Sequence, residues 1–241
     1  MIPPAARMTA VRLLAALIAT WSLNCAAAPF AVQVGEARIG LDAPSGFSDT
    51  TFTASPRLQE LSESLTPASN RILLFALSDA DLRRFTLGDP LDLRRYMIVV
   101  TPRSMERDRM TESIFKQFIG ESLTGVGAPP AEKDVVKYLD ARPAGTTNLL
   151  AELRKDADVV SILQGARTKG SGFFERSKYM LSSTTLLLLR GKALSLSIYT
   201  QYDDPSDLEW IRTKSHSETD FTRAPCHGIG HHAVEPDRGK Q

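Results

Sequence analysis

The chain has 241 residues, of which 42% are hydrophobic and 24% charged, a composition typical of a soluble protein that buries one sizeable core. Its 29 Lys and Arg residues and 28 Asp and Glu residues give a formal net charge of +1. Because there is no basic excess to displace counterions, we expect no nucleic-acid partner and no electrostatic attachment to an anionic membrane.

Residues 1–27 have the pattern of a secretory signal peptide. Arg7 and Arg12 precede an apolar run from Leu13 to Leu23, and small residues follow up to a cleavage point predicted after Ala27. Cleavage would leave 29 − 2 = 27 basic and 28 acidic residues, a net charge of −1. The sequence therefore predicts a periplasmic or secreted protein with no membrane span after cleavage.

Two alternatives to simple cleavage stay open. A lipoprotein signal would make Cys25 the acylated residue, but Ser22 and Asn24 stand where that pattern has an aliphatic and a small residue. An uncleaved anchor is the other alternative, although the apolar run is shorter than the roughly 20 residues of a membrane span. Cleavage would leave Cys226 as the only cysteine, so the core must stabilise the fold without a disulfide framework.

The segment Tyr179–Tyr202 predicts a long hairpin at the centre of a sheet. The continuous apolar run Leu186–Leu189 is typical of a strand that is covered on both faces. The second arm alternates instead, so one of its faces should meet the core and the other should be wetter. Gly191 supplies the conformational freedom that a tight turn needs.

The other predicted elements alternate between apolar strands and amphipathic helices bounded by Pro, Gly and capping residues. In chain order we expect a hairpin or bent strand at Phe30–Leu41, a turn at Ala43–Phe47, a helix from Pro56 to before Pro67, a strand at Asn70–Leu77, a capped helical turn after Ser78, a strand at Arg95–Val100, the best helix at Met105–Thr124, a short helix at Glu132–Asp140, strands at Leu149–Lys155 and Val159–Ala166, and a last helix from Pro205.

This order predicts an α+β fold, in which a mostly antiparallel sheet is flanked by helices in an α/β sandwich. We expect a single domain over residues 28–215 after the signal peptide. From about His216 the apolar periodicity ends, and charges, Pro225 and Pro236 follow. Residues 216–241 are therefore predicted to be a disordered or divergent tail.

At this point a resemblance is visible. The Pro44-Ser45-Gly46-Phe47 turn, the late antiparallel strands and the stretch LRGKALSLSIYTQYDDPSDLEWIR, running from strand into helix, resemble proteobacterial periplasmic proteins of unassigned function. Their layout is in turn similar to the PsbP-type α/β sandwich. The resemblance covers roughly Ala31–Arg212 and implies a fold and a periplasmic location; it carries no catalytic motif.

One group of residues has the chemistry of metal ligands. Cys226, His227, His231 and His232 put a thiol and three imidazoles close together, and such ligands suit zinc, copper or nickel. The segment is rich in glycine and would lose much chain entropy on closing around an ion. A metal site in the tail is therefore one hypothesis and a structureless tail is the other; we expect no cofactor.

Two further patterns match part of a catalytic or calcium-binding site, but neither pattern is complete. Ser113 and Lys116 have the S-x-x-K spacing of a serine nucleophile, but the companion motifs are missing. Asp203, Asp204, Asp207 and Glu209 could ligate calcium, yet their spacing does not fit a calcium loop, and Asp204 and Asp207 stand where they would cap the last helix.

All four histidines lie in or next to the tail, so no His-based catalytic site is expected inside the domain. The leading hypothesis is a non-enzymatic module that binds a partner protein or a small molecule on a sheet face or in a cleft. The alternatives are a periplasmic hydrolase whose site has no recognisable spacing, and metal handling through the tail.

Overall fold

The computed structural model describes residues 30–51, 53–89, 92–168 and 178–221, with the backbone alone for Phe30 and residues 217–221. Contacts divide the chain into two units, Met1–Phe30 and Ala31–Gln241. Apart from Phe30, all the described residues belong to the second unit.

The fold is built on a sheet of seven strands in the order β3-β4-β5-β9-β8-β7-β6, and every neighbouring pair is antiparallel. Its strands are β3 (Phe47–Asp49), β4 (Asn70–Ser78), β5 (Arg95–Pro102), β6 (Thr147–Lys155), β7 (Val159–Arg167), β8 (Tyr179–Leu189) and β9 (Lys192–Tyr202). A separate two-stranded ribbon consists of β1 (Phe30–Val34) and β2 (Ala37–Leu41).

The sheet consists of two meanders, β3-β4-β5 and β6-β7-β8-β9, in each of which neighbouring strands follow one another in the sequence. The two meanders meet at one seam, between β5 and β9. The seam pairs residues from Arg95↔Thr200 to Val100↔Ser195. The predicted hairpin is confirmed, since β8 and β9 pair with each other. Its second arm, β9, lies in the middle of the sheet. Arg190 and Gly191 both have positive φ, 52° and 75°, as the tight turn of a right-twisted hairpin requires.

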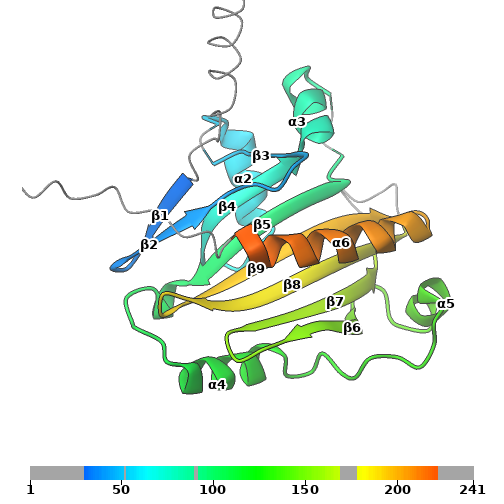
Figure 1. Ribbon diagram of the computed structural model, residues 1–241. Coiled ribbons are helices and arrows are strands. Elements are labelled where there is room, and N and C mark those ends of the chain that lie inside the picture. Colours follow the sequence, from blue (N-terminus) through cyan, green and yellow to red (C-terminus); the bar gives the residue numbers. More distant parts are fainter. Residues whose placement is uncertain (1–29, 52, 90–91, 169–177, 222–241) are drawn as a thin grey trace, which may run out of the picture. The chain divides into compact units, whose positions relative to one another are not determined.

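Helices cover both faces of the sheet (Figure 1). They are α2 (Pro56–Ser64), α3 (Asp79–Thr86), α4 (Glu112–Ser122), α5 (Val135–Asp140) and α6 (Pro205–Phe221), with a 3₁₀ turn at Arg103–Met105. In the part of the chain that the structure describes, no helix is long and apolar enough to cross a membrane.

Strand alternation shows which helices share a face. On β8, Leu181 packs against α6 and Leu186 against α4, and two residues of opposite parity point to opposite faces. Leu186 and Val100 are both paired with Ser195, and Val100 belongs to the cluster that α2 covers. Therefore α2 and α4 lie on one face of the sheet, and α6 lies on the other.

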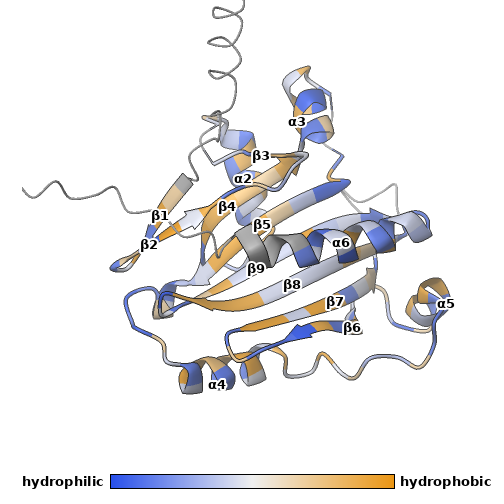
Figure 2. Ribbon diagram, in the orientation of Figure 1, coloured by the Kyte–Doolittle hydropathy of each residue, from blue (hydrophilic) through white to orange (hydrophobic). Residues whose placement is uncertain are grey.

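The hydrophobic core lies between the sheet and the helices on both of its faces. Figure 2 shows hydrophobic residues along the inner strands and a hydrophilic stretch on the edge strand β6. Leu194 and Leu196 of β9 are buried toward α6, as their alternation predicts, and Leu74 and Met97 are buried in β4 and β5. The predicted α+β fold with a mostly antiparallel sheet flanked by helices is confirmed.

Three details differ from the sequence-based expectation. The long helix begins at Glu112 and not at Met105, because the preceding residues form the 3₁₀ turn and a loop, and Thr111 accepts a hydrogen bond from the Ile114 N–H as its cap. Ile114 is 50% exposed and lies outside the apolar stripe. The last helix continues past His216 to Phe221. Main-chain hydrogen bonds can continue a helix beyond the point where its apolar stripe ends.

Candidate binding site

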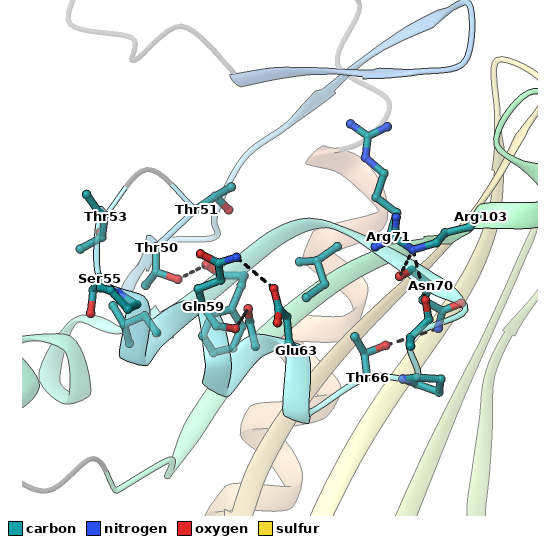
Figure 3. Close-up of a pocket in the computed structure, with 18 residues that line it drawn as sticks. Thr50, Thr51, Thr53, Ser55, Gln59, Glu63, Thr66, Asn70, Arg71 and Arg103 are labelled. Atoms are coloured by element: carbon teal, nitrogen blue, oxygen red, sulfur yellow. Dashed lines mark hydrogen bonds between the residues drawn. The ribbon is translucent and has the colours of Figure 1, made fainter.

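A cavity of about 910 Å³ lies beside α2, between the loop after β3 and the first half of β4 (Figure 3). Threonine, serine and amide side chains line it together with apolar residues such as Leu58, Ile72 and Phe75. Its charged lining residues are Glu63, Arg71 and Arg103. We refer to this cavity as the α2 pocket.

The short strand β3 explains why the pocket exists. It pairs only with the last three residues of β4, from Ala76 to Ser78. The Thr50 N–H and the Thr50 Oγ1 hydroxyl then both donate to the Phe75 carbonyl, each at 2.8 Å, and the chain turns away from the sheet. The first half of β4 is therefore paired with β5 on one side and has no strand on the other among the described residues.

One wall of the pocket is α2. Pro56 begins the helix, and Leu58 and Leu61 are buried against the sheet. This leaves Gln59 and Glu63, one helical turn apart, on the pocket side, where Gln59 Nε2 donates to Glu63 Oε1 at 3.0 Å. The wall is therefore polar although the same helix contributes to the core.

Basic residues define one end of the pocket (Figure 3). Arg103 Nε donates to the carbonyls of Ala68 and Asn70, both at 3.1 Å, which fixes the plane of the guanidinium. Arg71 forms an ion pair with Glu106 Oε1, so its charge is compensated within the fold. Among the described residues nothing pairs with the terminal nitrogens of Arg103, whose side chain is exposed.

A buried lysine holds the loop next to the basic end of the pocket. Lys192 is 5% exposed, and its Nζ donates to the carbonyls of Glu106 and Asp108 at 2.9 and 2.8 Å. These bonds attach the loop after β5 to the first residue of β9. Since that loop carries Arg103 and the partner of Arg71, Lys192 positions the basic end without lining the pocket.

A second cavity of about 260 Å³ lies between α4 and the sheet. Thr184 and Ser195 contribute to its lining, as does Asn70, which also lines the α2 pocket. Asn70 Nδ2 donates to Thr66 Oγ1 at 3.3 Å at the point where α2 leads into β4. The two cavities therefore adjoin at Asn70.

The α2 pocket has the chemistry of a polar recognition site. Its hydroxyls and amides can donate and accept hydrogen bonds, and Arg103 presents a planar cation suited to a carboxylate. The pocket size lies within the range of about 300–1,000 Å³ that is usual for small-molecule sites. The arrangement supports reversible binding of a polar ligand with an anionic group.

The residues singled out as metal ligands, Cys226, His227, His231 and His232, lie outside the described residues, as does Cys25. Within the described part of the chain, no group of three or more His, Cys, Asp or Glu side chains could hold a metal ion. The structure therefore brings no further ligand set to light and leaves the tail hypothesis as a prediction.

The two weaker patterns are placed by the structure. Ser113 and Lys116 are both exposed on α4. Asp207 Oδ2 accepts from the N–H groups of Asp203 and Asp204, and hydrogen bonds from Ser206 lower the pKa of Asp204. The acidic cluster therefore caps α6, as the sequence suggested.

Sequence reasoning missed the α2 pocket. Gln59 and Glu63 lie on α2 and Arg103 lies in the 3₁₀ turn after β5, and no motif spacing connects the two segments. The one signal in the sequence is the density of hydroxyl residues before α2, from Thr50 to Ser55. That density is typical of a loop as well as of a binding wall, so it does not identify a site by itself.

Comparison with known proteins gives little further guidance. No family model and no curated protein sequence matches this chain. Among solved structures it is similar to the Saccharomyces cerevisiae Ran-binding protein Mog1p, with 11% identity, a TM-score of 0.31, and coverage of 82% of this chain and 86% of that one. A mutant of Mog1 gives 11% identity and a TM-score of 0.33, covering 79% and 90%. Scores this low carry no argument about function, and the PsbP-type resemblance stays a prediction.

Proposed function

We propose that this protein is an exported, non-enzymatic binding module and that its ligand or partner occupies the α2 pocket. The observation that carries the proposal is the convergence of polar side chains from α2, the loop between β3 and α2, and the start of β4 on one cavity of about 910 Å³. Export rests on the signal-peptide pattern of residues 1–27.

The details of the pocket favour binding. Most of its polar groups that have partners bond to the protein's own main chain or to one another, as Thr50 does with Phe75 and Gln59 with Glu63. Such bonds fix the positions of the side chains before a ligand arrives, which lowers the entropy cost of association. These side chains are thus preorganised, and the exposed residues Thr51 and Thr53 add further hydroxyl groups to the lining.

The experiment is native and denaturing mass spectrometry of the full chain purified from its own host. We expect a mature chain that begins at Ala28 and a native mass increased by a ligand or partner. Ala54→Trp, which places an indole in the pocket from an exposed position, should remove that increase.

Ala131→Trp is the matched control, because Ala131 is exposed and lines neither cavity. An increase that survives Ala54→Trp would place the ligand elsewhere. An increase that a chelator removes would instead favour metal handling.

A further inference from the structure

We infer that the α2 pocket takes an extended peptide segment that carries an acidic residue, with the carboxylate on Arg103. The inference rests on the binding function proposed above and specifies the chemistry of the ligand. Three independent features of the pocket support it: its charge, its position along β4, and the kind of polar groups in its walls.

One cation of the pocket has no counterion among the described residues. Of the two arginines in the lining, Arg71 is paired with Glu106 and Arg103 has no ion pair. Glu63, the acidic lining residue, accepts a hydrogen bond from the neutral amide of Gln59 and keeps its charge. Arg103 donates from its Nε to two carbonyls, and its terminal nitrogens have no partner among the described residues. A guanidinium held in this way can bind a carboxylate through two parallel hydrogen bonds with little further loss of entropy.

The position of the pocket favours an extended chain as the ligand. It follows β4 from Asn70 to Phe75, the part of the strand that β3 leaves unpaired. At about 3.3 Å per residue, that stretch matches roughly five residues of extended peptide. A bulge between Ile72 and Leu74 interrupts the ladder, so we expect the pocket side chains to supply much of the hydrogen bonding in place of regular strand addition.

The walls fit a peptide main chain. Thr51, Thr53 and Ser55 stand on one side of the pocket and Gln59 and Thr66 on the α2 side (Figure 3). Hydroxyl and amide groups both donate and accept, so they can pair with alternating N–H and C=O groups without selecting one side-chain sequence. Specificity would then come from the acidic residue at Arg103.

The test is an NMR titration of the ¹⁵N-labelled full chain with the pentapeptide acetyl-AADAA-amide and its uncharged counterpart acetyl-AANAA-amide. We expect shifts centred on residues 50–55, 59–71 and 103, and about tenfold weaker binding of the Asn peptide. Arg103→Gln should remove the preference for the Asp peptide, whereas Arg107→Gln, an exposed change in the same loop, should keep it.

Two further measurements keep the outcome decisive. Arg103→Lys should retain part of the preference, which a general disturbance of the loop would not explain. Sodium acetate is the small-acid arm: if it binds at Arg103 as tightly as the Asp peptide, the ligand is a small carboxylic acid and the inference of a peptide is overturned. Equal binding of the two peptides, or shifts outside the pocket, would also overturn it.

Failure of this inference can be told apart from failure of the proposed function. If the peptides bind equally while Ala54→Trp still removes the ligand found in the native mass, the pocket binds something other than an acidic peptide. If Ala54→Trp leaves that mass unchanged, the pocket itself is not the binding site.

Discussion

Arg95 and Asp207 join the last helix to the seam of the sheet. Arg95 Nη2 donates to Asp207 Oδ1 at 2.8 Å, and the Asp207 side chain is 1% exposed. The Arg95 guanidinium also lies over the ring of Trp210, 4.1 Å from its centroid. One arginine of β5 thus holds α6 through an ion pair and a cation–π contact.

Asp207→Asn should therefore destabilise the protein by about 2 kcal/mol, because a buried carboxylate that binds Arg95 and caps the helix becomes neutral. Urea unfolding measures the change. Asp203→Asn is the control, since that side chain is 46% exposed and pairs with Arg94 at 3.4 Å; its cost should stay within about 0.5 kcal/mol. Equal losses for the two variants would contradict a special role of the buried pair.

Lys192→Met should loosen the loop that carries the basic end of the pocket. The variant keeps an unbranched side chain but leaves the carbonyls of Glu106 and Asp108 without their donor, at a cost of about 1–3 kcal/mol. Hydrogen exchange should rise in residues 103–110. Lys116→Met on the exposed face of α4 provides the comparison, and unchanged exchange in the loop of the Lys192 variant would refute the positioning role.

Two glycines with positive φ should respond differently to alanine. Gly35 has φ +54°, and a Cβ there would lie 2.4 Å from the Glu106 carbonyl oxygen, whereas Gly46 has φ +87° and open space around it. We expect Gly35→Ala to cost about 3 kcal/mol or more and Gly46→Ala about 1 kcal/mol, the conformational part alone. Thermal unfolding of both variants checks this, and similar losses would show that the Gly35 contact relaxes easily.

Tyr96 and Tyr199 should make stability fall in alkaline solution. Their rings stack at 4.4 Å with planes 9° apart, and burial raises the pKa of both phenols. A group whose pKa is higher in the folded state contributes stability that is lost as the pH rises above its unfolded value near 10. Unfolding measured between pH 9 and 11 should therefore show a steeper fall for the wild type than for Tyr96→Phe; parallel curves would contradict the assignment.

Much of the fold is predictable from the sequence because its signals are local. The apolar run Leu186–Leu189, the alternation after Lys192 and the Ser78 cap each concern neighbouring residues, and each corresponds to an observed element. The start of α4 is not predictable in this way. Residues before Thr111 have a helical pattern, but the loop they form is held by Lys192, far along the chain.

The candidate site depends even more on distant contacts. Arg103 becomes a pocket residue only because its Nε bonds to the carbonyls of Ala68 and Asn70, where the chain enters β4, and the pocket itself exists because β3 is short. Neither fact leaves a spacing or a motif in the sequence. The residues with recognisable chemistry, such as Ser113 and Lys116, are instead ordinary exposed residues of a helix.

The seam between the two meanders bears on the order of folding. Arg95 and Thr200, paired across it, are 105 residues apart, whereas each meander joins strands that follow one another in the chain. Closing so long a loop costs entropy that short hairpins avoid, so the meanders should form early and dock late. Pulse-labelled hydrogen exchange would then protect β8 amides bonded to β7 before the β5 amides that bond to β9.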